Sequence, residues 1–185
     1  NSLPVWLQNA GYHTALIGKY LNGFGPIGYV PPGWNTWNYI PDGTYYNYNL
    51  SDNGNLIFYS QQPPDYTTDV GAQRAENYIL SRQNNAQPFF LWLTPNAPHT
   101  SGSTTEPGSN INHPAVPAPR HIGVYDSLPL PQPPSFNEAD MSDKPSFMQA
   151  HPLMTAENIA AQTDRYRRSR EALLAVDDMV ERVVN

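Results

Sequence analysis

A lysine and a histidine follow two apolar segments of the chain, each near the point where a strand is expected to end. Lys19 comes shortly after Tyr12–Ile17, and His99 comes five residues after Phe89–Thr94. Ligands of open α/β sheets bind outside the carboxyl ends of the strands. A cation and an imidazole at two such ends can hold an anion, stabilise developing charge and protonate a leaving group. The sequence therefore predicts an anion-handling site built on Lys19 and His99.

The segments that must position these two residues follow the rhythm of an α/β fold. After Ser2, a good N-cap residue, residues 3–10 carry apolar side chains at helical spacing, and Gly11 suits the position after a helix. Tyr12–Ile17 is then a predicted strand. Phe89–Thr94 is apolar without alternation, as in a central parallel strand covered on both faces. We expect an α/β fold with a mainly parallel central sheet flanked by helices.

Between the two strands, the sequence predicts a tyrosine-rich β-hairpin and a helix. Residues 46–50 alternate in character, Asn53–Gly54 favours a type I′ turn, and residues 56–59 are apolar or aromatic. Thr68 or Asp69 is expected to cap the helix that follows. The tyrosines of the hairpin are more typical of packing than of sugar stacking.

Residues 95–153 form a proline-rich segment that holds twelve of the twenty prolines. Such a length is unusual for a connection, so we expect either a functional loop excursion or a disordered insert. Loops carry specificity, which makes Arg120, His121, Asp143 and Lys144 candidate substrate contacts. A purely structural role as turns and surface is the equal alternative for these four residues.

Thr155 is predicted to cap a last helix, which carries several charged residues. Neighbours on a helix point about 100° apart, so Asp177–Asp178 is more typical of a solvated face or of a helix-surface salt bridge with an arginine than of a paired-carboxylate site. The arginines of residues 165–170, interleaved with Asp164 and Glu171, are expected to form a solvated face.

The composition and net charge of the chain argue against several classes of protein and site. The chain has 185 residues and a net charge of -6, which argues against a nucleic-acid binder. It has no cysteine, hence no disulfide, thiolate metal site or cysteine nucleophile. No apolar run approaches the roughly 18 residues that span a membrane. Asn49 lies in an Asn-Leu-Ser sequon, a glycosylation candidate in a secreted eukaryotic protein.

Ten strings in one order make the chain resemble the sulfatases, most closely the branch of N-acetylglucosamine-6-sulfatases and extracellular heparan endosulfatases. The resemblance implies a partial alkaline-phosphatase-like fold, with residues 1–185 as part of the catalytic domain and residues 95–153 as a loop insertion within it. The strings are Gly11–Thr14, Gly18–Asn22, Val30–Trp34, Tyr45–Ser51, Tyr66–Val70, Pro88–His99, Ala118–Arg120, Pro134–Glu138, Ser142–Pro145 and Leu174–Val180.

The resemblance also implies roles for individual residues. Lys19 matches the family lysine that touches the sulfate and the ester oxygen, and His99 matches the histidine that binds sulfate opposite the metal. Many sulfatases have a histidine where this chain has Leu21. The proposed branch also lacks that histidine, and Asn22 is the candidate substitute. Substrates would be sulfated carbohydrates or aryl sulfates, and the protein would be secreted, periplasmic or lysosomal.

The family nucleophile is a formylglycine made from a cysteine, and its metal is Ca²⁺ held by carboxylates and an amide. Neither the cysteine motif nor the metal-binding segments occur here, so we expect both groups to come from outside this chain and the isolated chain to be inactive. A helical pattern begins near Ser2 and another is still running at Asn185. We therefore expect a middle portion of a catalytic domain. The alternatives are a non-catalytic sulfatase-like sugar-binding module and a related phosphatase or phosphodiesterase.

Overall fold

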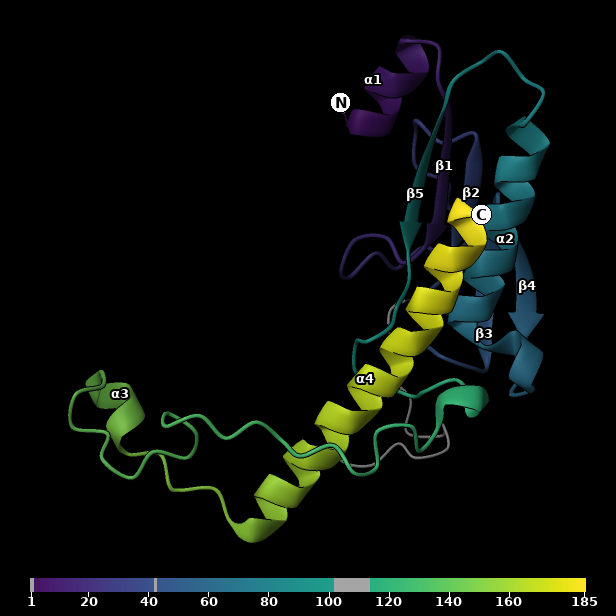
Figure 1. Cartoon of the computed structure of the whole chain (residues 1–185). Helices are drawn as coiled ribbons and strands as arrows, with labels where there is room; N and C mark the ends of the chain where they lie inside the picture. Colours follow the sequence, from purple (N-terminus) through teal and green to yellow (C-terminus); the bar gives the residue numbers. More distant parts are fainter. Residues whose placement is uncertain (1, 42, 102–113) are drawn as a thin grey trace.

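A computed structural model describes residues 2–41, 43–101 and 114–185 of the chain as an α/β structure (Figure 1). A five-stranded sheet has two long helices packed on one face and aromatic loop residues on the other. In chain order the elements are α1 (Leu3–Asn9), β1 (His13–Gly18), β2 (Thr36–Tyr39), β3 (Tyr48–Asp52), β4 (Asn55–Tyr59), η1 (Pro63–Asp65), α2 (Thr67–Arg82), β5 (Phe89–Thr94), η2 (Pro119–His121), α3 (Ser146–Gln149) and α4 (Ala156–Val184).

The strand order is β4-β3-β2-β1-β5. β1 is parallel to both β2 and β5, whereas β2, β3 and β4 pair antiparallel. The α/β class is thus confirmed, but the sheet is mixed and not mainly parallel. The reason is the predicted hairpin, which adds two antiparallel strands. Asn53 and Gly54 have φ values of 49° and 91° and reverse the chain in two residues, as a type I′ turn requires.

β5 differs from its expected place in the sheet. Among the described residues it pairs with β1 alone and is therefore an edge strand. Phe89 and Trp92 are about two-fifths exposed, at 41% and 40%. Its apolar composition identified a strand with the correct bounds, but composition does not state how many neighbours a strand has.

The two faces of the sheet are covered in different ways. Ala15 and Ile17 of β1 and Leu91 and Leu93 of β5 face α2 and the end of α4. The opposite face is aromatic, and Trp34 and Trp37 are buried there. Alternate residues of β1 and β5 therefore contribute to the cores on opposite faces of the sheet.

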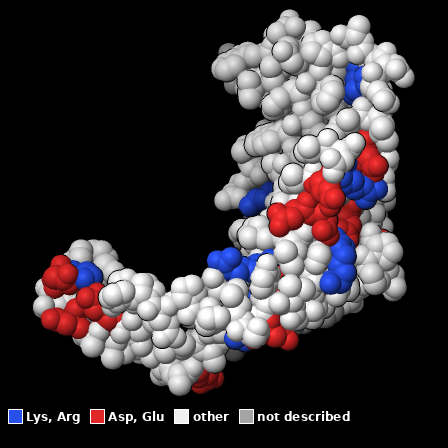
Figure 2. All heavy atoms as spheres, viewed as in Figure 1, with Lys and Arg blue, Asp and Glu red and all other residues white. Residues whose placement is uncertain are grey.

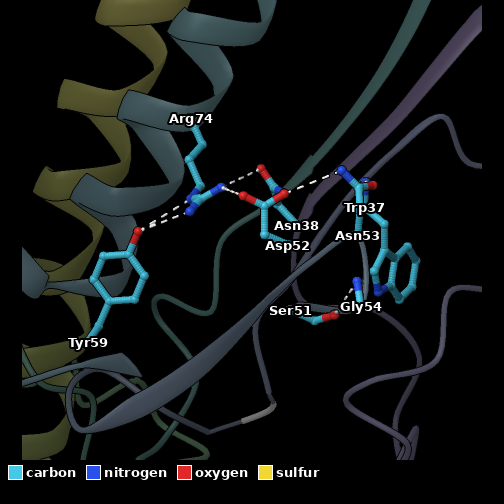
Figure 3. A network of polar contacts seen from close by, with 8 residues as sticks. All are labelled: Trp37, Asn38, Ser51, Asp52, Asn53, Gly54, Tyr59 and Arg74. Atoms are coloured by element: carbon cyan, nitrogen blue, oxygen red, sulfur yellow. Dashed lines mark hydrogen bonds and ion pairs between the residues drawn. The ribbon is translucent and has the colours of Figure 1, made fainter. Parts of the chain in front are cut away.

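A half-buried ion pair joins the hairpin to α2 (Figure 3). Arg74 of α2 donates to Asp52 of β3 at 3.0 Å and to the amide oxygen of Asn38 at 3.1 Å, and two of its nitrogens donate to the Tyr59 hydroxyl. Burial would lower the pKa of Arg74, but the hydrogen bonds with Tyr59 and Asp52 outweigh it and raise the pKa. The guanidinium thus holds β2, β3 and β4 against one turn of α2.

The predicted N-cap is correct for one of the two long helices and wrong for the other. Thr155 caps α4, and its hydroxyl accepts from the Asn158 N–H in a capping box, which confirms the prediction. The N-cap of α2 is Tyr66, so neither Thr68 nor Asp69 is the cap. Asp69 lies in the first turn instead and binds a distant arginine.

Residues 129–154 form an extended arm that carries α3 and lies away from the sheet (Figure 1). The proline-rich segment 95–153 is described except for residues 102–113, and η2 and α3 are the short helices found in its described part. Among the described residues, no helix has the length and apolar character needed to cross a bilayer.

We predict that Gly18→Ala destabilises the full-length protein by about 3 kcal/mol or more. Gly18 has φ +116°, and a Cβ there would lie 2.0 Å from the Thr94 carbonyl oxygen of the neighbouring strand. Urea unfolding measures the loss. Gly71→Ala in α2 is the matched control, because its Cβ would meet nothing within 4 Å. That control should be neutral or stabilising by about 1 kcal/mol, and equal losses in both variants would contradict the prediction.

Candidate functional site

The ends of β1 and β5 lie side by side. Gly18 pairs with Thr94 in the parallel register. The Lys19 N–H donates to the Thr94 carbonyl at 2.8 Å, and the Thr94 hydroxyl donates back to the Lys19 carbonyl at 2.5 Å. Lys19 and the turn that leads to His99 therefore leave the sheet at the same edge, from adjacent strands.

The His99 turn is closed by backbone and side-chain hydrogen bonds. The His99 N–H donates to the Asn96 carbonyl at 2.9 Å, and the His99 carbonyl accepts from the Tyr45 hydroxyl at 2.5 Å. The ring Nδ1 lies 2.9 Å from the Thr100 carbonyl. Because a carbonyl only accepts, Nδ1 carries the proton of the neutral ring and Nε2 carries the lone pair. The exposed imidazole can thus take up a proton at Nε2 and donate it to an anion.

A small cavity lies behind the two strand ends. Its lining comes from Gly18 and Lys19, from Thr94 to Asn96, and from Thr67, Thr68 and Gly71 at the start of α2. A larger pocket, of about 680 Å³, lies at the other end of β5, between Pro88, Phe89 and the last turns of α2 and α4. We place the candidate site at the first location, because ligands of α/β sheets bind at the carboxyl ends of the strands.

Asn22 and Asn49 are both exposed. Asn22 lies in a turn that the Phe24 N–H closes on the Leu21 carbonyl at 3.1 Å. This turn follows Lys19 directly, so Asn22 belongs to the same edge of the molecule as a candidate substrate contact. Asn49 lies on β3, and its glycosylation stays a prediction.

Arg120 and His121 enter an ion-pair network that joins η2 to both long helices. The Arg120 guanidinium donates to both carboxylate oxygens of Asp69 in α2, at 2.7 and 2.8 Å, and through Nε to Asp178 in α4 at 2.8 Å. His121 Nε2 donates to the same Asp178 oxygen at 2.8 Å. Of the two roles expected for Asp178, a solvated face or a salt bridge with an arginine, the structure shows the salt bridge. A substrate contact of Arg120 or His121 stays a prediction.

The network shifts the pKa values of its members. The hydrogen bonds with Asp69 raise the pKa of Arg120, against the effect of burial. Burial alone would raise the pKa of Asp178, but hydrogen bonds from His121 and Arg120 outweigh it and hold the pKa below its ordinary value of 3.8. Sequence reasoning missed the Asp69–Arg120 pair, since 51 positions separate its members and no local pattern links them.

Glu171 is buried, in contrast to the solvated face expected for it. It is 4% exposed, and one carboxylate oxygen accepts from the N–H groups of Gly123 and Tyr125 at 2.9 and 3.2 Å. The helical charge pattern could not show this, because the loop that covers Glu171 comes from nearly fifty residues earlier in the chain.

Asp143 and Lys144 lie near α3 on the arm. Lys144 Nζ contacts Asp143 at 2.6 Å and Glu138 at 3.1 Å. Figure 2 shows charged side chains of both signs at the tip of the arm, separate from those that gather over α2 and α4. Within this chain, the arm tip is not brought to the strand ends that carry Lys19.

The described residues do not supply the metal site, and the sequence does not supply the nucleophile, that the family resemblance implies. Among residues 2–41, 43–101 and 114–185, no three His, Cys, Asp or Glu side chains cluster in a way that could hold a metal ion. Formylglycine is made from cysteine, and the sequence contains none. The described residues therefore supply cationic and imidazole groups but neither of those two components.

Comparison with known proteins points to one family. The family model described as Sulfatase matches residues 1–185. An arylsulfatase of Volvox carteri is 35% identical over 195 residues, which cover 98% of this chain and 30% of that protein. The N-acetylglucosamine-6-sulfatase of Bos taurus is 31% identical over 192 residues, with coverage of 100% and 32%. Extracellular sulfatases are also among the relatives.

The fold is shared with solved structures. One of them, described as a complex with its substrate D-glucosamine-2-N,6-O-disulfate, matches with a TM-score of 0.64 and 20% identity. The match covers 100% of this chain and 46% of that one. The chain thus spans about a third of the length of the curated relatives above and less than half of this solved structure.

We predict that Asp178→Asn costs about 1 kcal/mol of stability at pH 7 in the full-length protein, a value reduced by the partial exposure of the pair. A carboxyl whose folded pKa is lowered stabilises the fold above its ordinary pKa and loses that contribution as the pH falls through the folded pKa. The difference between variant and wild type should therefore shrink below about pH 3.8.

Denaturant unfolding at pH 7 and pH 3 measures this difference. Asp177→Asn is the matched control, since Asp177 is the exposed neighbour on the same helix. It should change stability at neither pH. A loss for Asp178→Asn that is as large at pH 3 as at pH 7 would rule out the charge network as its cause.

Proposed function

The chain belongs to the sulfatase family, and we propose that the protein hydrolyses sulfate esters of carbohydrate or aryl alcohols. Lys19 and His99 serve in this proposal as sulfate-binding and leaving-group-stabilising residues. The observation that carries it is the parallel register of Gly18 with Thr94, which brings the two strand ends together. The relatives at 31–35% identity include an arylsulfatase and an N-acetylglucosamine-6-sulfatase, which supports both substrate classes.

The proposed reaction converts ROSO₃⁻ and water to ROH, sulfate and a proton. Negative charge builds up on the sulfate oxygens and on the departing alkoxide in the transition state. The Lys19 ammonium offsets that charge from a backbone fixed by two hydrogen bonds to Thr94. His99 donates from Nε2 when protonated, because Nδ1 is held by the Thr100 carbonyl. Asn22 supplies an amide close to Lys19 in the chain.

In the family, formylglycine supplies the nucleophile and Ca²⁺ supplies charge neutralisation. Since this chain has no cysteine and its described residues no metal cluster, we assign neither role within it. The isolated 185 residues should accordingly show no turnover. We further propose that the protein is secreted, periplasmic or lysosomal, in keeping with the extracellular sulfatases among its relatives.

We predict that Lys19→Met and His99→Ala each lower the turnover of the full-length protein by about 100-fold or more, the typical effect of removing one preorganised donor. Initial rates with 4-methylumbelliferyl sulfate and with a sulfated glucosamine measure the effect. His151→Ala is the control, because this exposed histidine lies on the arm, and its rate should match the wild type.

Near-wild-type rates in both variants would overturn the assignment of Lys19 and His99. Parallel assays with 4-methylumbelliferyl phosphate separate the proposal from phosphoryl transfer, since a preference for the phosphate ester would favour a phosphatase. Absence of turnover on every ester, with sugar binding retained, would favour a non-catalytic module.

A further inference from the structure

The hydroxyl of Tyr45 holds the backbone of the His99 turn from outside that turn. It donates to the His99 carbonyl at 2.5 Å across 54 positions of sequence. Within the described part of the chain, the other hydrogen bonds of His99 are local: its N–H donates to the Asn96 carbonyl, and its ring Nδ1 donates to the Thr100 carbonyl. Tyr45 is therefore a long-range link between the imidazole-bearing residue and the body of the protein, beside the bond that the Gly43 N–H donates to the Asn96 amide oxygen.

Tyr45 is itself rigidly placed. Its side chain is fully buried, and its ring stacks on Tyr66 with a centroid separation of 5.8 Å. Its backbone carbonyl accepts from the Thr67 N–H at 3.1 Å, which ties it to the first turn of α2. Ala97, two residues before His99, packs in the same buried cluster. A buried, stacked and hydrogen-bonded phenol has few rotamers available, so its hydroxyl keeps one position relative to the core.

Fixing the carbonyl of His99 also fixes where its ring can go. The carbonyl and the Cβ share one Cα, and Nδ1 is bound to the next carbonyl along the chain. Rotation of the turn about its ends would carry Nε2 with it. Because a displacement of about 1 Å at a reacting group can cost orders of magnitude in rate, a restraint on this turn has kinetic consequences.

We propose that Tyr45 is a positioning residue for His99, and this inference rests on the proposed function. Its hydroxyl contributes no atom to the reaction. It sets the place of the His99 turn relative to Lys19, whose own backbone is set by Thr94. Tyr45 directly precedes the predicted tyrosine-rich hairpin, for whose tyrosines the sequence indicated packing.

Tyr66 offers a matched control for this role. It lies in the same buried cluster, is fully buried, and donates its hydroxyl to a carbonyl, that of Val116, at 2.8 Å. Tyr45→Phe and Tyr66→Phe each remove a hydroxyl that donates to a backbone carbonyl and keep the aromatic ring. A purely structural role predicts equal effects of the two changes on stability and activity.

The experiment compares both variants in the full-length protein with 4-methylumbelliferyl sulfate. Tyr45→Phe should lower kcat by about tenfold, and Tyr66→Phe should leave it within about twofold, with similar losses of thermal stability in the two. In a His99→Ala background, Tyr45→Phe should lower the rate no further, because residues that act through one another are not additive. Replacing Tyr45 by 4-aminophenylalanine, which keeps a donor at the same position, should restore kcat.

Equal kcat values for Tyr45→Phe and Tyr66→Phe, or an undiminished effect of Tyr45→Phe in the His99→Ala background, would overturn the inference. Should Tyr45→Phe fail to fold, the 4-aminophenylalanine variant alone decides: a folded protein with kcat as low as that of His99→Ala would refute the role. Wild-type activity of His99→Ala would instead refute the proposed role of His99, and absence of sulfate-ester turnover in the wild type would refute the proposed function, so these failures are distinguishable from failure of the Tyr45 inference.

Discussion

The pairing of β1 with β5 at Gly18 and Thr94 is the contact on which the rest of the candidate site depends. The backbones approach so closely there that a Cβ on Gly18 would lie 2.0 Å from the Thr94 carbonyl oxygen. Hydrogen bonds in both directions between Lys19 and Thr94 continue the ladder by one residue beyond the strand. A glycine is therefore required at this position, and it delivers the lysine to the edge of the sheet with a defined direction.

Around that contact, two sets of interactions hold the loops in place. Buried tyrosines bind backbone carbonyls of the proline-rich segment: Tyr45 binds that of His99, and Tyr66 binds that of Val116. Charged groups do the same at the surface, where Arg120 joins Asp69 of α2 to Asp178 of α4. A segment poor in regular structure is thus anchored by side chains of the helices and the loops next to them. These contacts hold the described part of the proline-rich segment in place, although it contains no strand.

Several features were readable from local sequence because short-range physics produces them. The Asn53–Gly54 turn, the Thr155 capping box and the strand Phe89–Thr94 each depend on a few adjacent residues. Other predictions were wrong because they depend on what packs from far along the chain. Glu171 fits a solvated helix face by pattern, yet a loop from residues 123–125 buries it. β5 has the composition of a central strand, yet pairs on one side only within the described residues.

The sequence by itself determined the family, the fold class and the two residues proposed for sulfate chemistry, because motif order and apolar periodicity are properties of the linear chain. It could place Lys19 and His99 at strand ends, but not side by side. Only the tertiary structure decided that β1 and β5 are neighbours in register, and that Tyr45 and Thr94 restrain the two residues. The physical reason is that these are contacts between segments 54 to 77 positions apart, whose partners are chosen by packing of the whole sheet and not by any local preference.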